Sequence, residues 1–317
     1  MDFDLNMFMK ESFCDIWLQL LEVPADYTFT PEIKLVKTYE YATFNAELYI
    51  QNNGPGTTQR VMITLPKNVS GKLPAVVVPF YFPEAMIGFE FETLEPLPRF
   101  SEIAMCKDLA ERGFITITAD AYHLTYCPEY KADRLGFDRW QNAGSALLKD
   151  YPQWCGCGKL TADTRLLLDV LESDERVDSS RIGIAGHSLG GKMAFYTGCI
   201  DARVKVILAS DFGIGWEQTN WRDVWYWGDK VEPMKSAGLD HSQLLDIAGG
   251  KPFMLLAGKF DNMESWEIMT RSQAYKDVPE NLEIINHATG HRPPQDVLHA
   301  GYRFLEKYLK NGTGAGE

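Results

Sequence analysis

The chain has 317 residues, of which 45% are hydrophobic, so it is long enough to bury the core of one large domain. Its formal net charge of −13 argues against binding to nucleic acid, whose phosphates attract lysine and arginine, and against an anionic membrane surface. No apolar run is long enough to span a bilayer, and the acidic N-terminus lacks the basic start of a secretory signal. We therefore expect a cytoplasmic protein with no nucleic-acid or membrane partner.

The N-terminal part is expected to hold one helix and a set of antiparallel strands. Apolar residues recur at helical spacing over residues 3–22, which predicts an amphipathic helix within a helical extension over residues 1–30. Residues 33–50 and 58–65 are β-rich and partly alternating, and the Asn-Asn-Gly-Pro-Gly sequence at 52–56 predicts a turn between them. These segments predict antiparallel strands that open a mixed sheet.

From residue 73 onward, strands alternate with helices. We expect strands at 74–79, 114–119, 181–185, 204–209, 252–257 and 282–285, and helices at 100–112, 161–175, 193–199, 264–276 and 295–310. Such alternation is typical of a doubly wound, mostly parallel sheet with helices on both faces. The predicted fold class is α/β.

Two stretches do not fit this alternation and are interpreted as insertions into one domain that spans residues 31–311. They lie at 122–159 and 212–248, and both follow the C-terminal ends of strands, where open α/β sheets bind ligands. Their aromatic side chains could stack on a flat or sugar-like ligand, or they could fill the core of a lid. Under the first interpretation the candidate substrate-binding residues are Trp216, Trp221 and Trp225.

The strongest functional signal is a candidate nucleophile. Residues 186–190 read Gly-His-Ser-Leu-Gly, which fits the G-x-S-x-G nucleophile elbow. A strand-like run precedes this motif and a helix-like segment of small and apolar residues follows it. In so sharp a turn the glycines leave room where a Cβ would collide, and the Ser188 hydroxyl projects above the sheet. The alternative is a chance match in a glycine turn.

A serine hydroxyl needs a base and an acid that orients the base, and in this arrangement both follow the serine along the chain. His291 lies in a loop after the predicted strand at 282–285 and is the expected base; His287 is its rival. Asp261 follows the strand at 252–257 and is the expected acid. Asp211, after the preceding strand, is the alternative, and Asp261 could instead cap the next helix.

Two main-chain N–H groups are needed to hold the developing oxyanion. We expect one from Leu189, the residue after the nucleophile, and one from the loop after the first parallel strand, at Phe80 or Tyr81. The Tyr81 hydroxyl could also point into the pocket. Phe80 and His187 are further candidate substrate-binding residues.

With these residues assigned, the chain resembles the α/β-hydrolase superfamily over roughly residues 30–310. Within it, the chain is similar to the dienelactone-hydrolase and acetyl-xylan-esterase-like branch. The matching segments are 76–81, 119–122, 186–191, 258–261 and 290–291. The resemblance implies a triad of Ser188, Asp261 and His291, with main-chain donors at Tyr81 and Leu189.

The resemblance also bears on the substrate. A dienelactone hydrolase uses a cysteine nucleophile, whereas this chain has a serine, which favours ordinary ester hydrolysis. The acetyl-xylan-esterase-like relatives often act on esters of plant polysaccharides, which favours sugar esters.

The predicted function is that of a serine carboxylesterase that hydrolyses small acyl esters, with acetylated or otherwise esterified carbohydrates among the candidates. It would work through an acyl-enzyme, without a metal or cofactor. The pair Cys155 and Cys157 lacks the second pair that a structural zinc site needs. The alternatives are a serine peptidase or amidase of the same superfamily and a non-catalytic binding protein with the hydrolase fold.

Overall fold

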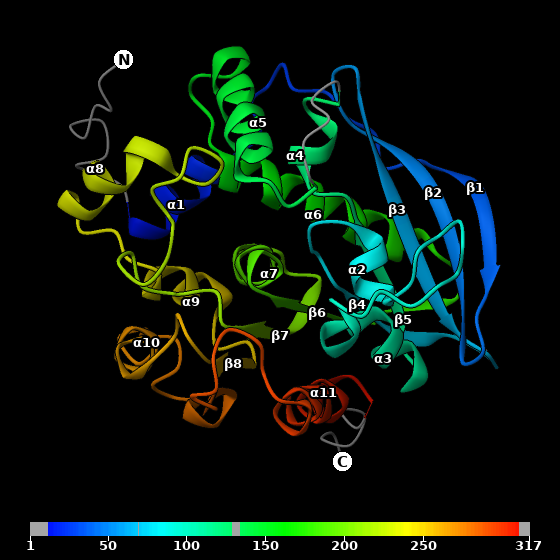
Figure 1. The fold of residues 1–317 in the computed structure, drawn as a ribbon. Coiled ribbons are helices and arrows are strands. Elements are labelled where there is room, and N and C mark those ends of the chain that lie inside the picture. Colours follow the sequence, from blue (N-terminus) through cyan, green and yellow to red (C-terminus); the bar gives the residue numbers. More distant parts are fainter. Residues whose placement is uncertain (1–11, 69, 129–133, 311–317) are drawn as a thin grey trace.

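The structure is a computed structural model that describes residues 12–68, 70–128 and 134–310. Within these ranges the strands form a nine-stranded sheet in the order β1-β2-β3-β5-β4-β6-β7-β8-β9 (Figure 1). In this order β4 and β5 are exchanged and a run of parallel strands follows, an arrangement that strand–helix–strand connections produce. The α/β class with an antiparallel N-terminal part is confirmed.

The antiparallel part consists of β1 (Ile33–Glu40), β2 (Phe44–Gly54) and β3 (Thr57–Pro66). The expected strand run at 33–50 is thus two strands, because the chain turns at residues 41–43. The expected turn at 52–56 overlaps the end of β2, and the two residues at 55–56 join β2 to β3. β3 then pairs antiparallel with β5, which fastens this hairpin to the rest of the sheet.

The remaining strands pair in parallel. Because both faces of the sheet are covered here, their sequences are nearly continuous apolar runs, and every residue of β5 and β8 is buried. These strands are β4 (Leu73–Val77), β5 (Ile115–Ala119), β6 (Val177–His187), β7 (Val204–Ser210), β8 (Phe253–Ala257) and β9 (Leu282–Asn286).

Helices cover both faces of the parallel part, and the core is divided between them (Figure 1). α6 (Gly156–Ser173) and α7 (Leu189–Ile200) pack on one face, and α3 (Met105–Glu111) and α11 (Gln295–Leu309) pack on the other. Successive residues of β4 alternate between the two clusters, as the pleat of a strand requires. Short helical segments complete the connections: α2 (Pro83–Ile87), η2 (Ser101–Ile103), α10 (Met263–Met269) and η4 (Pro279–Asn281).

The N-terminal helix is shorter in the described residues than its sequence pattern predicts. α1 spans Phe13–Leu21, and its N-cap Ser12 accepts a hydrogen bond from the Asp15 amide at 3.2 Å. The part of the predicted helix at residues 3–11 lies outside the described residues. Trp17 is fully buried and donates from Nε1 to Gln243 Oε1 at 2.9 Å, which attaches α1 to α9 (Ser242–Ala248).

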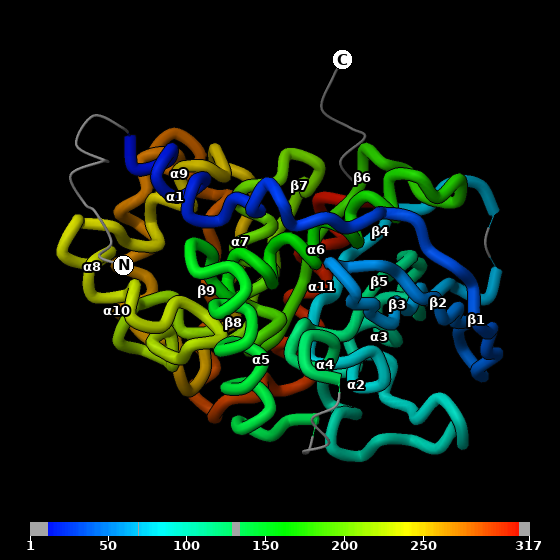
Figure 2. The backbone as a smooth tube through the Cα atoms, turned by 90° about the horizontal axis from the view of Figure 1, so that it is seen from above, coloured from blue at the N-terminus to red at the C-terminus, as the bar shows by residue number. Residues whose placement is uncertain are grey.

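The two insertions lie against each other. The first holds α4 (Tyr122–Thr125) and α5 (Phe137–Asp150) and runs into the start of α6; the second holds η3 (Gly228–Lys230), α8 (Val231–Ser236) and α9. A Cβ on Gly144 of α5 would touch the main chain of Trp225 in the second insertion, so the two segments are in direct contact (Figure 2). The boundaries predicted for the domain and its insertions stay predictions.

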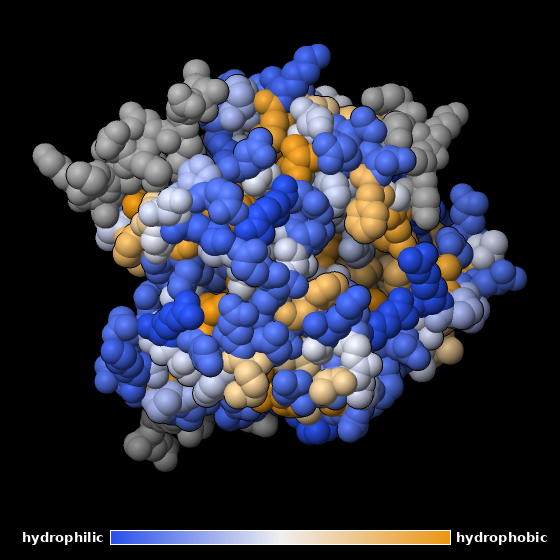
Figure 3. All heavy atoms as spheres, turned by 60° about the vertical axis from the view of Figure 1, so that its left-hand side comes forward, coloured by the Kyte–Doolittle hydropathy of each residue, from blue (hydrophilic) through white to orange (hydrophobic). Residues whose placement is uncertain are grey.

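The outer surface is mostly polar in the view of Figure 3, where apolar side chains gather in separate patches among hydrophilic ones. Across the described residues, no helix combines the length and the apolar character needed to cross a membrane.

Candidate active site

Ser188 lies on the sharp turn that its sequence motif predicts. β6 ends at His187 and α7 begins at Leu189, so a single residue joins strand to helix, and its backbone has φ 58° and ψ −117°. Non-glycine residues rarely adopt such a positive φ, and holding one there costs roughly 1–3 kcal/mol. A Cβ on Gly186 would collide with the Gly190 carbonyl, and one on Gly190 would collide with the Pro79 carbonyl, which explains both glycines.

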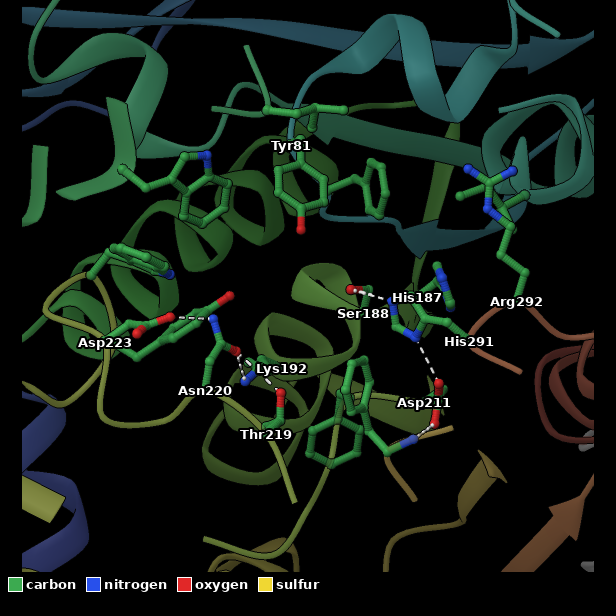
Figure 4. Close-up of a pocket in the computed structure, with 18 of the residues that line it drawn as sticks. Tyr81, His187, Ser188, Lys192, Asp211, Thr219, Asn220, Asp223, His291 and Arg292 are labelled. Atoms are coloured by element: carbon green, nitrogen blue, oxygen red, sulfur yellow. Dashed lines mark hydrogen bonds and ion pairs between the residues drawn. The ribbon is translucent and has the colours of Figure 1, made fainter. Parts of the chain in front are cut away.

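His291 lies beside Ser188 in the pocket. It follows β9 in a loop where Gly290 has φ 117°, a conformation that favours glycine. The Nε2 atom of His291 lies 2.9 Å from the Oγ atom of Ser188, within hydrogen-bond distance (Figure 4). The rival His287 instead pairs its Nδ1 with the Thr289 hydroxyl at 2.8 Å.

The carboxylate that contacts His291 belongs to Asp211, so the prediction of Asp261 for this position is wrong. Asp211 directly follows β7, and its Oδ2 atom lies 2.6 Å from His291 Nδ1 (Figure 4). Its Oδ1 atom accepts the amides of Gly258, Phe260 and Asp261 at 3.1, 2.8 and 3.0 Å. These amides orient the carboxylate, which is fully buried.

Asp261 has a different role because its carboxylate binds other groups than the histidine. Its oxygens accept the amides of Gly213 at 2.8 Å and Ile214 at 2.9 Å, and Oδ1 also accepts the Ser265 hydroxyl at 2.8 Å. The two aspartates thus tie the loops after β7 and β8 together, each binding the amides of the other's loop. Asn262, rather than Asp261, caps α10.

The surroundings of Asp211 keep it ionised. Burial alone would raise its pKa, but the hydrogen bonds from His291 and from the Asp261 and Phe260 amides outweigh burial, so the pKa of Asp211 lies below its usual value. Beside this pair, burial lowers the pKa of His187 to about 3. His187 therefore stays neutral with its ring 4.6 Å from that of His291, and its Nδ1 pairs with the Ser210 hydroxyl at 3.1 Å.

The expected oxyanion donors border the serine. Leu189 is the first residue of α7, where amides have no acceptor within the helix. Gly190 packs on Pro79, which brings the loop that carries Tyr81 beside the elbow. The Tyr81 hydroxyl points into the cavity (Figure 4). Burial raises the pKa of Tyr81, an effect that its interaction with Ser188 opposes. The use of the Leu189 and Tyr81 amides as donors stays a prediction.

A cavity of about 950 Å³ opens at Ser188. Of the predicted substrate-binding residues, Phe80, His187 and Trp225 line it. Trp216 and Trp221 do not line it: their indole N–H groups donate to main-chain carbonyls of Leu239 and of Gly213 and Gly215, and their rings pack inside the second insertion. For these two residues the lid-core interpretation holds.

The cavity also has a polar end. Lys192, Thr219, Asn220 and Asp223 lie across the cavity from His291 and are linked to one another by hydrogen bonds (Figure 4). Trp140 and Tyr226 complete the aromatic wall. A charged residue within the otherwise small and apolar helix sequence at 189–200 was the available signal for Lys192.

Comparisons with known proteins agree with this architecture. The dienelactone hydrolase family matches residues 59–210, a segment that contains Ser188 and ends one residue before Asp211. The Bacillus subtilis (strain 168) protein named "Putative hydrolase YtaP" is 23% identical over 257 residues, which cover 77% of this chain and 81% of that protein.

Two solved structures share the fold at low sequence identity. A "putative acetyl xylan esterase" from Bacteroides fragilis has a TM-score of 0.67 at 14% identity, covering 100% of this chain and 80% of its own. A glucuronoyl esterase from Solibacter usitatus has a TM-score of 0.67 at 12% identity, covering 96% of this chain and 93% of its own. The chain thus shares the fold of these two structures, and its central segment, residues 59–210, matches the dienelactone hydrolase family.

Proposed function

We propose that this protein is a serine esterase in which Ser188, His291 and Asp211 form the catalytic triad. The observation that carries the proposal is one continuous hydrogen-bonded chain, from Ser188 Oγ to His291 Nε2 at 2.9 Å and from His291 Nδ1 to Asp211 at 2.6 Å. These residues come from the ends of three different strands, yet their side chains meet in the geometry that activates a serine. The match to a hydrolase family supports the same conclusion.

The chemistry follows from these contacts. His291 takes the proton of the Ser188 hydroxyl as Oγ attacks the ester carbonyl, and Asp211 stabilises the imidazolium that forms without taking its proton. The amides of Leu189 and Tyr81 would hold the oxyanion. His291 then gives its proton to the leaving alcohol, and a water molecule releases the acid from the acyl-serine by the same steps.

The substrate class that fits best is a small acyl ester on a polar alcohol, including an esterified carbohydrate. A long acyl chain needs an extended apolar channel, whereas this cavity ends in the charged and amide groups of Lys192, Asn220 and Asp223. The names of the structural neighbours, an acetyl xylan esterase and a glucuronoyl esterase, support carbohydrate esters.

The proposal is tested with wild type, Ser188→Ala and the matched control Ser242→Ala, a buried serine that bonds Asp240 outside the cavity. Each is assayed with p-nitrophenyl esters from acetate to octanoate and with the corresponding acetanilide, and each is exposed to a fluorophosphonate before intact-mass measurement. We expect turnover of short esters and a single adduct in wild type and the control, and neither in Ser188→Ala.

Three results would contradict the proposal. Activity that survives in Ser188→Ala would assign the reaction to another group. A preference for the anilide would make the protein an amidase. Absence of both turnover and adduct in wild type would favour a non-catalytic binding protein.

A further inference from the structure

A buried lysine lines the cavity without a carboxylate partner. Lys192 is only 4% exposed, and its Nζ donates to Asn220 Oδ1 at 3.2 Å. The rings of Trp221 and Tyr226 lie 3.8 and 4.3 Å from the ammonium, measured to their centroids. Among the described residues, no carboxylate oxygen lies within ion-pair distance of this nitrogen.

Such an ammonium has donors to spare. A lysine carries three N–H donors, and Asn220 takes one of them. Aromatic faces attract a cation but accept no full hydrogen bond. Leaving a buried charge short of partners is unfavourable, and burial accordingly lowers the pKa of Lys192 to about 7. A ligand in the cavity that offers oxygen acceptors would remove this deficit.

The groups around Lys192 alternate between donors and acceptors. Asn220 accepts from Lys192 and from the Thr219 hydroxyl at 3.1 Å, and its amide nitrogen donates to Asp223. A sugar hydroxyl both donates and accepts, so adjacent hydroxyls can bind Lys192 and Asp223 together. Lys192 and Asp223 together carry no net charge. An anionic ligand group would be attracted by Lys192 but repelled by Asp223.

The distance between this cluster and Ser188 fits a single sugar ring that carries the reacting ester group. Ser188 and Lys192 lie one turn apart at the start of α7, which corresponds to a rise of about 6 Å. Trp140 and Trp225 also line this cavity and contribute apolar surface to it, with their rings in edge-to-face contact.

We propose that Lys192, Asn220 and Asp223 form a subsite that binds the free hydroxyls of a neutral sugar ring in the substrate. This inference rests on the proposed esterase function and specifies its substrate. Binding at this subsite would place a single ester group of the ring against Ser188, so the enzyme would select esters on partly substituted sugars.

The test compares two sets of substrates that differ only in free hydroxyls. The first set is methyl xylopyranosides with one acetyl group, at position 2, 3 or 4, and the second set is the same esters with both remaining hydroxyls methylated. Release of acetate gives kcat and KM for each. For at least one isomer, we expect wild type to prefer the free-hydroxyl ester about 10- to 100-fold in kcat/KM, because hydrogen bonds to charged groups are of this strength.

Lys192→Met and Asp223→Asn should each lower this preference toward unity, mainly through KM. The matched control is Lys251→Met, which removes a half-buried lysine that bonds Gly198 and Asp201 at the far end of α7. It should keep the wild-type preference. Thermal melting of every variant shows whether the fold remains intact, and the rate of fluorophosphonate labelling shows whether Ser188 remains reactive. If Lys192→Met does not fold, the less disruptive Asp223→Asn still tests the subsite.

The inference is overturned if wild type shows no preference for any isomer, or if the preference persists in both variants. It is also overturned, with the esterase function intact, if wild type hydrolyses p-nitrophenyl acetate and reacts with the fluorophosphonate but hydrolyses none of the pyranosides. Failure of every ester together with absence of the adduct would instead remove the proposed function itself.

Discussion

Replacing each of the two aspartates with asparagine separates the residue that orients His291 from the residue that only braces the loops. In Asp211→Asn, the amide oxygen can keep the three main-chain donors at 2.8–3.1 Å, which places the amide nitrogen against His291 Nδ1. An N–H group at that position makes Nδ1 an acceptor and leaves the proton on Nε2. The imidazole then cannot accept the Ser188 proton.

The expected loss is large and does not come from unfolding. A wrong tautomer of this kind lowers kcat by about 10⁴-fold in a serine protease, which corresponds to about 5 kcal/mol in the activation barrier. Asparagine tolerates the positive φ of 40° at position 211, so the backbone gains little strain. The melting temperature should therefore change little.

Asp261→Asn should have the opposite profile. Its two oxygens accept Gly213, Ile214 and Ser265, and an asparagine must turn its N–H groups toward at least one of these donors. Leaving such a buried donor unpaired costs about 1–3 kcal/mol of folding free energy. Because this carboxylate does not touch His291, kcat should fall less than about tenfold, a change too small for loss of a triad member.

Both variants are assayed for kcat and KM on p-nitrophenyl acetate and on an ester of a poorer leaving group, alongside urea unfolding. A loss of about a thousandfold in Asp261→Asn, with Asp211→Asn within tenfold of wild type, would refute this assignment and restore the one expected from the sequence.

Three further variants test the packing and charge of the site. Gly190→Ala should lose about 1–3 kcal/mol of stability and most activity because its Cβ meets the Pro79 carbonyl; unchanged denaturation and turnover would contradict this. Lys192→Met should be more stable than wild type, by up to about 4 kcal/mol near pH 6, because the lysine pKa is about 7 in the fold and about 10.4 when unfolded. Between these two pKa values the unfolded wild-type chain binds a proton that the folded chain does not, so wild type becomes more stable as pH rises. The stability gained by Lys192→Met should therefore shrink toward pH 10, and a gain that is constant with pH would exclude titration of this group. Trp17→Ala should lose about 3–5 kcal/mol in urea unfolding, since it leaves a cavity and removes the hydrogen bond to Gln243; a loss below 1 kcal/mol would mean that α1 is not a structural part of the domain.

The features that could be predicted from the sequence are those set by local patterns. Ser188 was found because its strand, glycines and helix are contiguous, and His291 because a loop after a strand and a preceding glycine are visible in the chain. The parallel strands were located for the same reason, since burial on both faces makes each a short apolar run.

The choice between Asp211 and Asp261 could not be made from local sequence. Both aspartates follow strands, and the two loops differ in how they bend over neighbouring strand ends, which depends on tertiary contacts. The tryptophans posed a similar problem: Trp216 and Trp225 lie in one insertion, yet Trp216 packs inside it and Trp225 faces the cavity. Lys192 was missed because its helix is otherwise buried, and a charge there is explained only by the cavity beside it.

The order of the proposed triad along the chain has a consequence for synthesis. β6, β7 and β9 each supply one residue, and Asp211 and His291 are 80 positions apart. A polypeptide emerging from the ribosome therefore presents the elbow long before it has the base. Until β9 is added at the edge of the sheet, the nascent chain holds Ser188 without the base proposed for it, so the proposed mechanism allows hydrolysis only once the sheet is complete.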